Sequence, residues 1–233
     1  MSTQGKPPGW HGKLPSLGDF ASRRLDDTFI EPWDGWLAAG LLALREAAPE
    51  SWLEQYLASP SWRFLLMPGV LPAGQGAWAG VLMPSVDKVG RYFPLTLVLP
   101  LGDGPGNTQQ MAGLWHWLGR LDDLARDALY EDWSAEQLES ELARMALPEL
   151  CALPAPELTV PTSTGAVAEA ASAGGADASY HIGVEAQRAW AERARGCAWW
   201  HARPDELPAR LLLTRGLPDP QSMSRLFGAA ATI

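Results

Sequence analysis

Cysteine and positive charge are both scarce in this chain of 233 residues. The two cysteines, Cys151 and Cys197, lie outside any CxxC motif, which argues against a disulfide framework and indicates a reducing compartment. Lysine and arginine together number 18 against 27 acidic residues, so the net charge is −9. Nucleic-acid recognition and binding to anionic lipid both depend on cationic side chains, so this charge balance argues against both.

Long apolar segments are missing as well. No window of ~20 apolar residues is present that would form a membrane-spanning helix. The first residues, MSTQGKPP, have no apolar core of a signal peptide. We therefore expect a cytoplasmic protein without membrane insertion, in which residues 1–8 are a flexible N-terminus.

The composition that is present is that of a globular protein. Apolar residues make up 47% of the chain and charged residues 19%. The length suits one large domain or two small ones. Tryptophan is abundant, with 12 residues, and we interpret most of them as core filling, with an aromatic recognition surface as the alternative.

The most informative stretch covers residues 80–101, where two apolar runs flank a polar connection. Residues 80–83 are predicted to end one strand, and residues 92–101 to form the next, which is apolar enough to be buried on both faces. Loops between core strands often carry function. The connection, residues 84–91, contains the polar side chains Ser85, Asp87, Lys88 and Arg91.

Periodicity and turn signals predict the remaining elements. Strands are expected at residues 10–14, 61–67, 76–83, 197–201 and 210–214, and helices at 25–44, 50–58, 111–130 and 134–145, with a short helix after residue 217. Pro32 suggests that the first helix starts late or kinks. In the third helix, Asp122 and Asp123 are expected to point largely outward. Ser134 and Gln137 form a capping-box pattern at the start of the fourth.

Residues 162–179 are rich in alanine, glycine, serine and threonine and have few large side chains. Such a segment cannot bury a core, so we predict a mobile surface loop. The part of the chain that follows it is too short to fold independently. We therefore predict a single domain over residues 9–233.

Patterns for metal and nucleotide binding are weak. A metal site could be drawn from His181, Cys197 and His201 with Cys151 as a fourth ligand, but the Cys-x-x-x-His spacing is not typical of zinc. The glycine-rich turn at residues 101–107 lacks the spacing of a dinucleotide fingerprint and the lysine of a phosphate-binding loop. The sequence therefore predicts no metal and no cofactor.

Patterns for nucleophilic catalysis are equally weak. A serine nucleophile would be Ser16 or Ser85, and neither lies in a G-x-S-x-G motif. His11 lies near Ser16 in sequence, but that proximity says little about geometry. Asp19 and Asp87 would form a carboxylate pair only if their loops meet. The alternative for all of these residues is a structural role in caps, turns and ion pairs, and we predict that the protein is not an enzyme.

Four segments, taken together, resemble one known family. They are GKLPSLGDF at residues 12–20, WDGWL at 33–37, WRF at 62–64 and GVLMPSVDKVGRYFPL at 80–95. Their order and spacing are similar to those of the TagF/ImpM family of bacterial type VI secretion. AWW at 198–200 and GLP at 216–218 resemble the C-terminal segment of that family more loosely.

This resemblance implies an α/β (α+β) fold with a largely antiparallel mixed sheet flanked by helices on both faces. It also implies a cytoplasmic accessory protein that represses secretion post-translationally by binding a forkhead-associated scaffold protein. The resemblance also implies a functional link to a threonine kinase/phosphatase pair. It implies no catalytic residues in this chain. The alternatives are a structural or assembly component of the secretion apparatus and, less favoured, a hydrolase.

The partner-binding residues are expected where two polar loops meet. Lys13, Ser16 and Asp19 lie in the loop of residues 12–20, and Asp87 and Arg91 lie in the loop of residues 84–91. One hypothesis is that the loops form a contact surface for the partner protein. The other is that the loops brace each other, with Asp19 and Asp87 accepting hydrogen bonds from backbone N–H groups.

Overall fold

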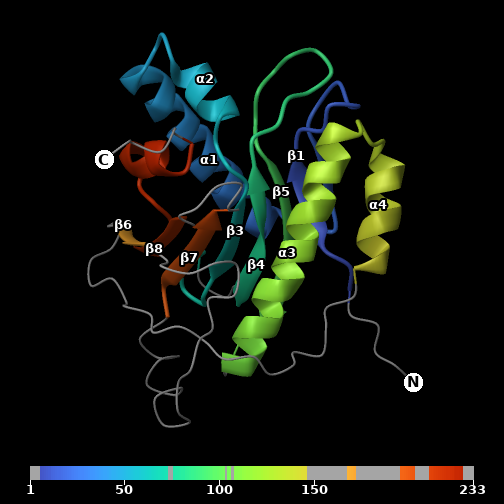
Figure 1. The fold of residues 1–233 in the computed structure, drawn as a ribbon, viewed down its shortest axis with the longest axis vertical. Coiled ribbons are helices and arrows are strands. Elements are labelled where there is room, and N and C mark those ends of the chain that lie inside the picture. The colour runs from blue at the N-terminus through green and yellow to red at the C-terminus, as the bar shows by residue number, and fades with distance from the viewer. Residues whose placement is uncertain are drawn as a thin grey trace.

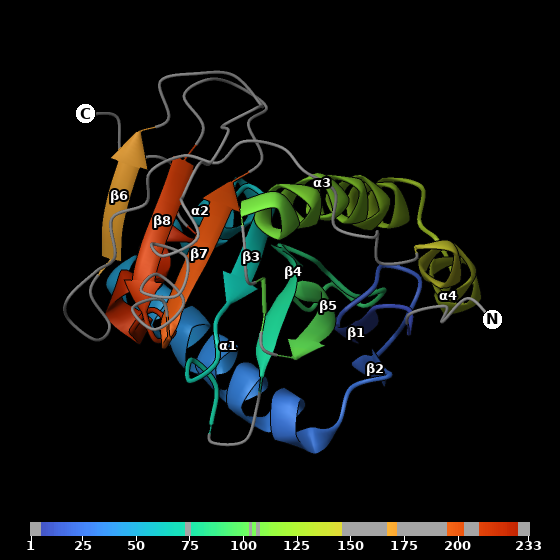
Figure 2. The ribbon, with the colours of Figure 1, turned by 90° about the horizontal axis from the view of Figure 1, so that it is seen from below.

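The computed structural model describes residues 6–72, 76–102, 104–105, 108–145, 167–171, 195–202 and 210–227. An eight-stranded sheet runs through them in the order β2-β1-β5-β4-β3-β7-β8-β6 (Figures 1 and 2). Every strand pairing within these ranges is antiparallel. The strands are β1 (Gly9–Gly12), β2 (Ala21–Arg23), β3 (Trp62–Leu66), β4 (Ala77–Met83), β5 (Leu95–Gly102), β6 (Val167–Ala171), β7 (Cys197–Ala202) and β8 (Arg210–Arg215).

Helices cover both faces of this sheet, as predicted. One face carries α1 (Asp27–Ala47), α2 (Trp52–Leu57) and the 3-10 helix η1 (Pro220–Arg225). The other carries α3 (Thr108–Tyr130) and α4 (Ala135–Arg144), and Figure 2 shows α1 and α3 on opposite sides of the strands. The predicted α+β class with a largely antiparallel sheet is therefore confirmed.

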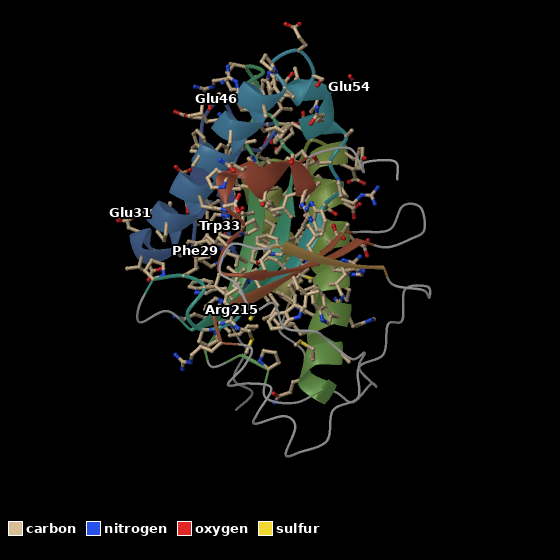
Figure 3. The ribbon with its side chains drawn as sticks, turned by 90° about the vertical axis from the view of Figure 1, so that its left-hand side faces the viewer. Phe29, Glu31, Trp33, Glu46, Glu54 and Arg215 are labelled. Carbon is tan, nitrogen blue, oxygen red and sulfur yellow. The ribbon has the colours of Figure 1, made fainter. Side chains whose placement is uncertain are left out.

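The sheet separates two hydrophobic cores because successive strand residues point to opposite faces. In β3, Phe64 packs into the core under α1 while its neighbour Leu65 packs into the core under α3. Phe64 packs against both Trp33 and Trp200, with ring centroids 5.1 and 5.4 Å away. Figure 3 shows Phe29 and Trp33 on α1, among the side chains that this helix packs against the sheet. Tryptophan thus fills the cores, as predicted: the fully buried large side chains include Trp10, Trp33, Trp62, Trp117, Trp199 and Trp200.

Two expectations about the helices were wrong. The first helix does not start late at Pro32, because α1 runs through this residue from Asp27 to Ala47; the other option, a kink at Pro32, stays a prediction. Pro32 removes one backbone hydrogen bond from the helix. The apolar face of α1 is buried both before and after Pro32, and this burial offsets the loss. Asp122 on α3 does not point outward: it is 0% exposed, and its carboxylate accepts hydrogen bonds from Ser61 Oγ at 2.5 Å and Arg63 Nε at 2.9 Å.

The segment predicted as a mobile loop contains a strand. β6 occupies Val167–Ala171 and pairs with β8 at one edge of the sheet, so the loop prediction was wrong for these residues. Backbone groups form the ladder, which requires no large side chains. The remainder of residues 162–179 lies outside the described ranges. In the segment predicted as a flexible N-terminus, Pro8 is buried and its carbonyl accepts a hydrogen bond from Arg24 Nε at 2.9 Å.

Candidate functional site

The sheet brings the loops of residues 12–20 and 84–91 together. β1 pairs antiparallel with β5, with His11 opposite Thr96, so the end of β1 lies beside the start of β5. The first loop follows β1, and the second joins β4 to β5. Gly12 makes this approach possible: its φ is +128°, and a Cβ atom there would lie 2.0 Å from the carbonyl oxygen of Pro94. We call the two segments the braced loops, for the contacts that follow.

Asp87 is at the centre of these contacts. Its Oδ2 accepts hydrogen bonds from Lys13 Nζ at 2.5 Å and Arg91 Nε at 2.7 Å. Its Oδ1 accepts from the backbone N–H groups of Val89 at 3.0 Å and Arg91 at 2.9 Å. Lys13 is 2% exposed and Asp87 3%, so this ion pair is buried between the loops. Burial favours the neutral carboxyl, but the bonds from Lys13, Arg91 and Val89 outweigh it and hold the pKa of Asp87 well below its usual range.

Backbone and hydroxyl groups join the loops further. The backbone N–H of Lys88 donates to the carbonyl of Leu17 at 2.8 Å. Ser85 Oγ donates to the carbonyl of Lys13 at 2.8 Å. The hydroxyl of Tyr56, on α2, donates to the carbonyl of Ser85 at 3.0 Å and accepts from its N–H at 2.9 Å. Burial raises the pKa of Tyr56, so this phenol stays protonated and keeps both bonds.

The outer side of the braced loops carries the remaining predicted residues. The Arg91 side chain is 53% exposed, and its Nη2 donates to the carbonyl of Gly18 and lies 3.5 Å from Asp19 Oδ1. Asp19 is exposed and accepts the N–H of Phe20 at 2.8 Å. Ser16 Oγ donates to the carbonyl of Trp133 at 2.7 Å, which attaches the first loop to the turn between α3 and α4.

The structure thus brings all of the predicted contact residues to one place but gives them different orientations. Lys13, Ser16 and Asp87 bond to other parts of the protein, and both Asp19 and Asp87 accept backbone N–H groups. This is the geometry of loops that brace each other. Asp19 and Arg91 remain at the surface, and contact with a partner protein stays a prediction for this site.

A pocket of about 280 Å³ lies beside the braced loops, near Pro15 and Pro84. Its lining combines Pro15, Pro84 and Ser85 with parts of α2, the segment that follows it and the end of α3. The serine hydroxyls in it are committed: Ser59 donates to the carbonyl of Gln55, Ser61 to Asp122 and Ser85 to the carbonyl of Lys13. Ser16 and Ser85 both donate to backbone carbonyls, so neither is arranged as a nucleophile with a base. His11 bonds to Asp34 rather than to a serine.

The residues considered for a metal site are placed only in part. Cys151 and His181 lie outside the described ranges. Cys197 is 1% exposed on β7, and burial raises the pKa of its thiol. Burial, with help from the charge of Arg63, lowers the pKa of His201 to about 4. Across the described part of the chain, no three histidine, cysteine or acidic side chains are grouped to hold a metal ion.

Sequence reasoning missed several members of this site. Phe20 lies under the cation of Lys13, with Nζ 4.3 Å from the ring centroid, and packs at 4.9 Å against Phe93. Tyr56 lies in the helix expected at residues 50–58, and its hydroxyl bonds to both backbone groups of Ser85. Nothing in the local sequence signals either contact, because each joins residues far apart in the chain.

Comparison with known proteins identifies the family. A family model described as "TagF N-terminal domain, Type VI secretion system-associated" matches residues 9–145, which is more than half of the chain. The chain belongs to the TagF family. The resemblance noted in the sequence is thereby confirmed, and this TagF protein is associated with type VI secretion. The matched range contains both braced loops and ends at Met145, the residue that caps α4.

A solved structure extends the similarity over nearly the whole length. The crystal structure of PA0076 from Pseudomonas aeruginosa PAO1 is 30% identical, superposes with a TM-score of 0.74, and is matched over 97% of this chain and 96% of that one. The comparison with curated proteins finds no match. Within the described ranges, no helix of this TagF chain is long and apolar enough to span a membrane.

Proposed function

We propose that this TagF protein is a cytoplasmic, post-translational repressor of type VI secretion that binds a forkhead-associated scaffold protein. The scaffold is held in one complex and is therefore withdrawn from the assembling apparatus by mass action. A threonine kinase/phosphatase pair is linked to the same control. The membership in the TagF family carries this proposal, since it associates the chain with type VI secretion.

The braced loops support a role in binding rather than in chemistry. Protein interfaces gain affinity when their surface is already rigid in the free state, because less conformational entropy is lost on binding. Asp19 and Arg91 are held at the surface by hydrogen bonds to the loop backbones. The pocket nearby offers no support for the alternative of a hydrolase, since its serine hydroxyls are committed to other acceptors.

The other alternative is a structural or assembly component of the secretion apparatus. A component of this kind should co-purify in stoichiometric amount with the assembled apparatus, and its deletion should abolish secretion. A repressor should be absent from the assembled apparatus, and its deletion should raise secretion. Measuring secretion in a deletion strain therefore separates the two functions.

Direct binding is tested with the full chain and the purified scaffold protein by isothermal titration calorimetry. We expect a complex, and we expect the double charge reversal Asp19→Lys with Arg91→Glu to weaken it. Glu46→Lys is the control, because Glu46 is an exposed acid on α1, outside the braced loops (Figure 3). Absence of binding by the wild-type protein, or unchanged secretion in the deletion strain, would overturn the proposal.

A further inference from the structure

The turn at the end of the second braced loop presents an apolar side chain to solvent. Val89 is 66% exposed, between the exposed residues Lys88 and Gly90. Polar residues are the usual occupants of such turns. Large exposed apolar side chains are few within the described ranges, and two of them belong to the braced loops: Phe20, Leu42, Leu57, Val89 and Tyr130.

The backbone around Val89 is held at every neighbouring position. The N–H groups of Val89 and Arg91 donate to Asp87 Oδ1, the N–H of Gly90 donates to the Asp87 carbonyl at 2.9 Å, and the N–H of Lys88 donates to Leu17 at 2.8 Å. Gly90 has φ +83°, and a Cβ atom there would meet nothing within 4 Å. The turn conformation, not packing, therefore requires glycine at this position. The valine side chain is exposed on a backbone that is already ordered.

The exposed aromatic residue of the first loop rests on the same buried ion pair. The ring of Phe20, 46% exposed, lies under Lys13, with Nζ 4.3 Å from the ring centroid. Lys13 Nζ in turn bonds to Asp87 at 2.5 Å, and Asp87 holds the turn that carries Val89. One buried pair thus supports both of the exposed apolar side chains in the braced loops.

The charge around Val89 is opposite to that of the whole protein. Lys88 is exposed and forms no ion pair with any described residue, whereas Arg91, 53% exposed, is paired with Asp87 at 2.7 Å and lies 3.5 Å from Asp19. The braced loops hold three cations, Lys13, Lys88 and Arg91, against two acids, Asp19 and Asp87, so their net charge is +1. The net charge of the chain is nevertheless −9. A cationic rim on an acidic protein favours a partner surface that is itself acidic.

We propose that Val89 is a docking knob, flanked by Lys88 and Arg91, that enters an apolar recess rimmed by carboxylates on a partner protein. The proposal rests on the proposed function, because it takes the forkhead-associated scaffold protein as that partner. Phe20 adds apolar contact at the edge of the same surface. Because the turn is ordered before binding, the knob loses little conformational entropy when it is buried.

The test compares Val89→Ser with the matched control Leu42→Ser, using the full chain and the purified scaffold protein. Leu42 is 55% exposed on α1, so both variants replace an exposed aliphatic side chain by serine. We expect Val89→Ser to weaken binding by about tenfold or more and Leu42→Ser by less than about twofold. Thermal unfolding monitored by circular dichroism checks that both variants are folded, and Val89→Thr, which keeps the shape, replaces Val89→Ser if the latter is destabilised.

The charged rim is tested by the salt dependence of the same complex. The wild-type association rate should fall as the NaCl concentration is raised, and Lys88→Glu should lower the rate and flatten this dependence. If the wild-type protein does not bind the scaffold, the proposed function fails. If the wild-type protein binds but Val89→Ser and Leu42→Ser have equal affinities, the docking knob alone is wrong. A rate that is independent of salt refutes the acidic rim of the partner.

Discussion

Replacing Lys13 with methionine tests whether the buried ion pair holds the two loops together. The ammonium of Lys13 is the one charged partner of Asp87 that is itself enclosed, since Lys13 is 2% exposed and the Arg91 side chain 53%. Methionine is similar in length and apolar, so Lys13→Met removes the charge with little change in packing. We expect the variant to fold but to be clearly less stable.

The size of the effect follows from what Asp87 retains. Breaking a buried pair by removing one partner costs about 3–5 kcal/mol. Asp87 keeps Arg91 Nε at 2.7 Å and two backbone N–H groups, which places the loss at the lower end of that range. Loss of the cation–π contact with Phe20 adds about 1 kcal/mol. The free energy of unfolding should therefore fall by about 3–4 kcal/mol.

Urea unfolding at pH 7, monitored by tryptophan fluorescence, measures this loss. Asp19→Asn is the control: Asp19 is exposed and 3.5 Å from Arg91, and asparagine still accepts the N–H of Phe20. An exposed pair contributes about 0–1 kcal/mol, so the control should unfold almost as the wild-type protein does. A loss below about 1 kcal/mol for Lys13→Met, or an equal loss in both variants, would refute the reasoning that the pair is a brace.

Three further predictions concern the rest of the fold. Burial lowers the pKa of His201 from 6.5 to about 4, so the unfolded chain binds a proton in that interval while the folded chain does not. Stability should fall by up to about 3 kcal/mol as the pH drops from 6.5 to 4. When the free energy of unfolding is measured by urea titration at several pH values, His201→Gln should lack this part of the decrease. A variant whose stability falls with pH as the wild-type protein's does would contradict the lowered pKa of His201. Ser134→Ala should cost about 1 kcal/mol in urea unfolding, because it removes the capping box of α4; a loss near zero would show that the cap is dispensable. Gly80→Ala should lower stability by about 3 kcal/mol or more, since its Cβ would lie 2.2 Å from the carbonyl oxygen of Leu97. Gly35→Ala, in α1 with nothing within 4 Å, should instead stabilise by about 0.5–1 kcal/mol, and equal melting temperatures for the two glycine variants would argue against this packing.

Local chemistry was enough to place many of the elements. The capping box of Ser134 and Gln137 involves residues three apart, and both of its hydrogen bonds are present. The strands on either side of residues 84–91 were recognised because the apolar runs and the polar turn between them are local signals. The helix expected at residues 25–44 was recognised from its periodicity. That it runs through Pro32 could not be predicted, because the cost of the proline is local while the burial that offsets it comes from the sheet. β6 was missed since its alanines give no strand signal, and its pairing with β8 joins distant segments.

The candidate site divides in the same way. The two polar loops could be recognised in the sequence, and their meeting was a hypothesis that the pairing of β1 with β5 bears out. Which side chains face inward could not be predicted, because this depends on groups from other elements. Lys13 points inward to its ion pair with Asp87, and the hydroxyl of Ser16 donates to the carbonyl of Trp133. Asp122 on α3 is a similar case. Its hydrogen-bond donors are Arg63 on β3 and Ser61, the residue before that strand.

The sequence by itself determined the family, the α+β class, most helix and strand positions and the polar character of residues 84–91. These features rest on patterns that span a few residues, where propensity, turn chemistry and periodicity act directly. Only the tertiary structure decided that Asp87 is buried and holds the two loops together. The same structure leaves the side chains of Val89 and Arg91, whose backbones Asp87 binds, exposed to solvent. The physical reason is that burial and pairing are set by residues distant in the chain, as Lys13 and Asp87 are, and these meet only when β1 lies beside β5.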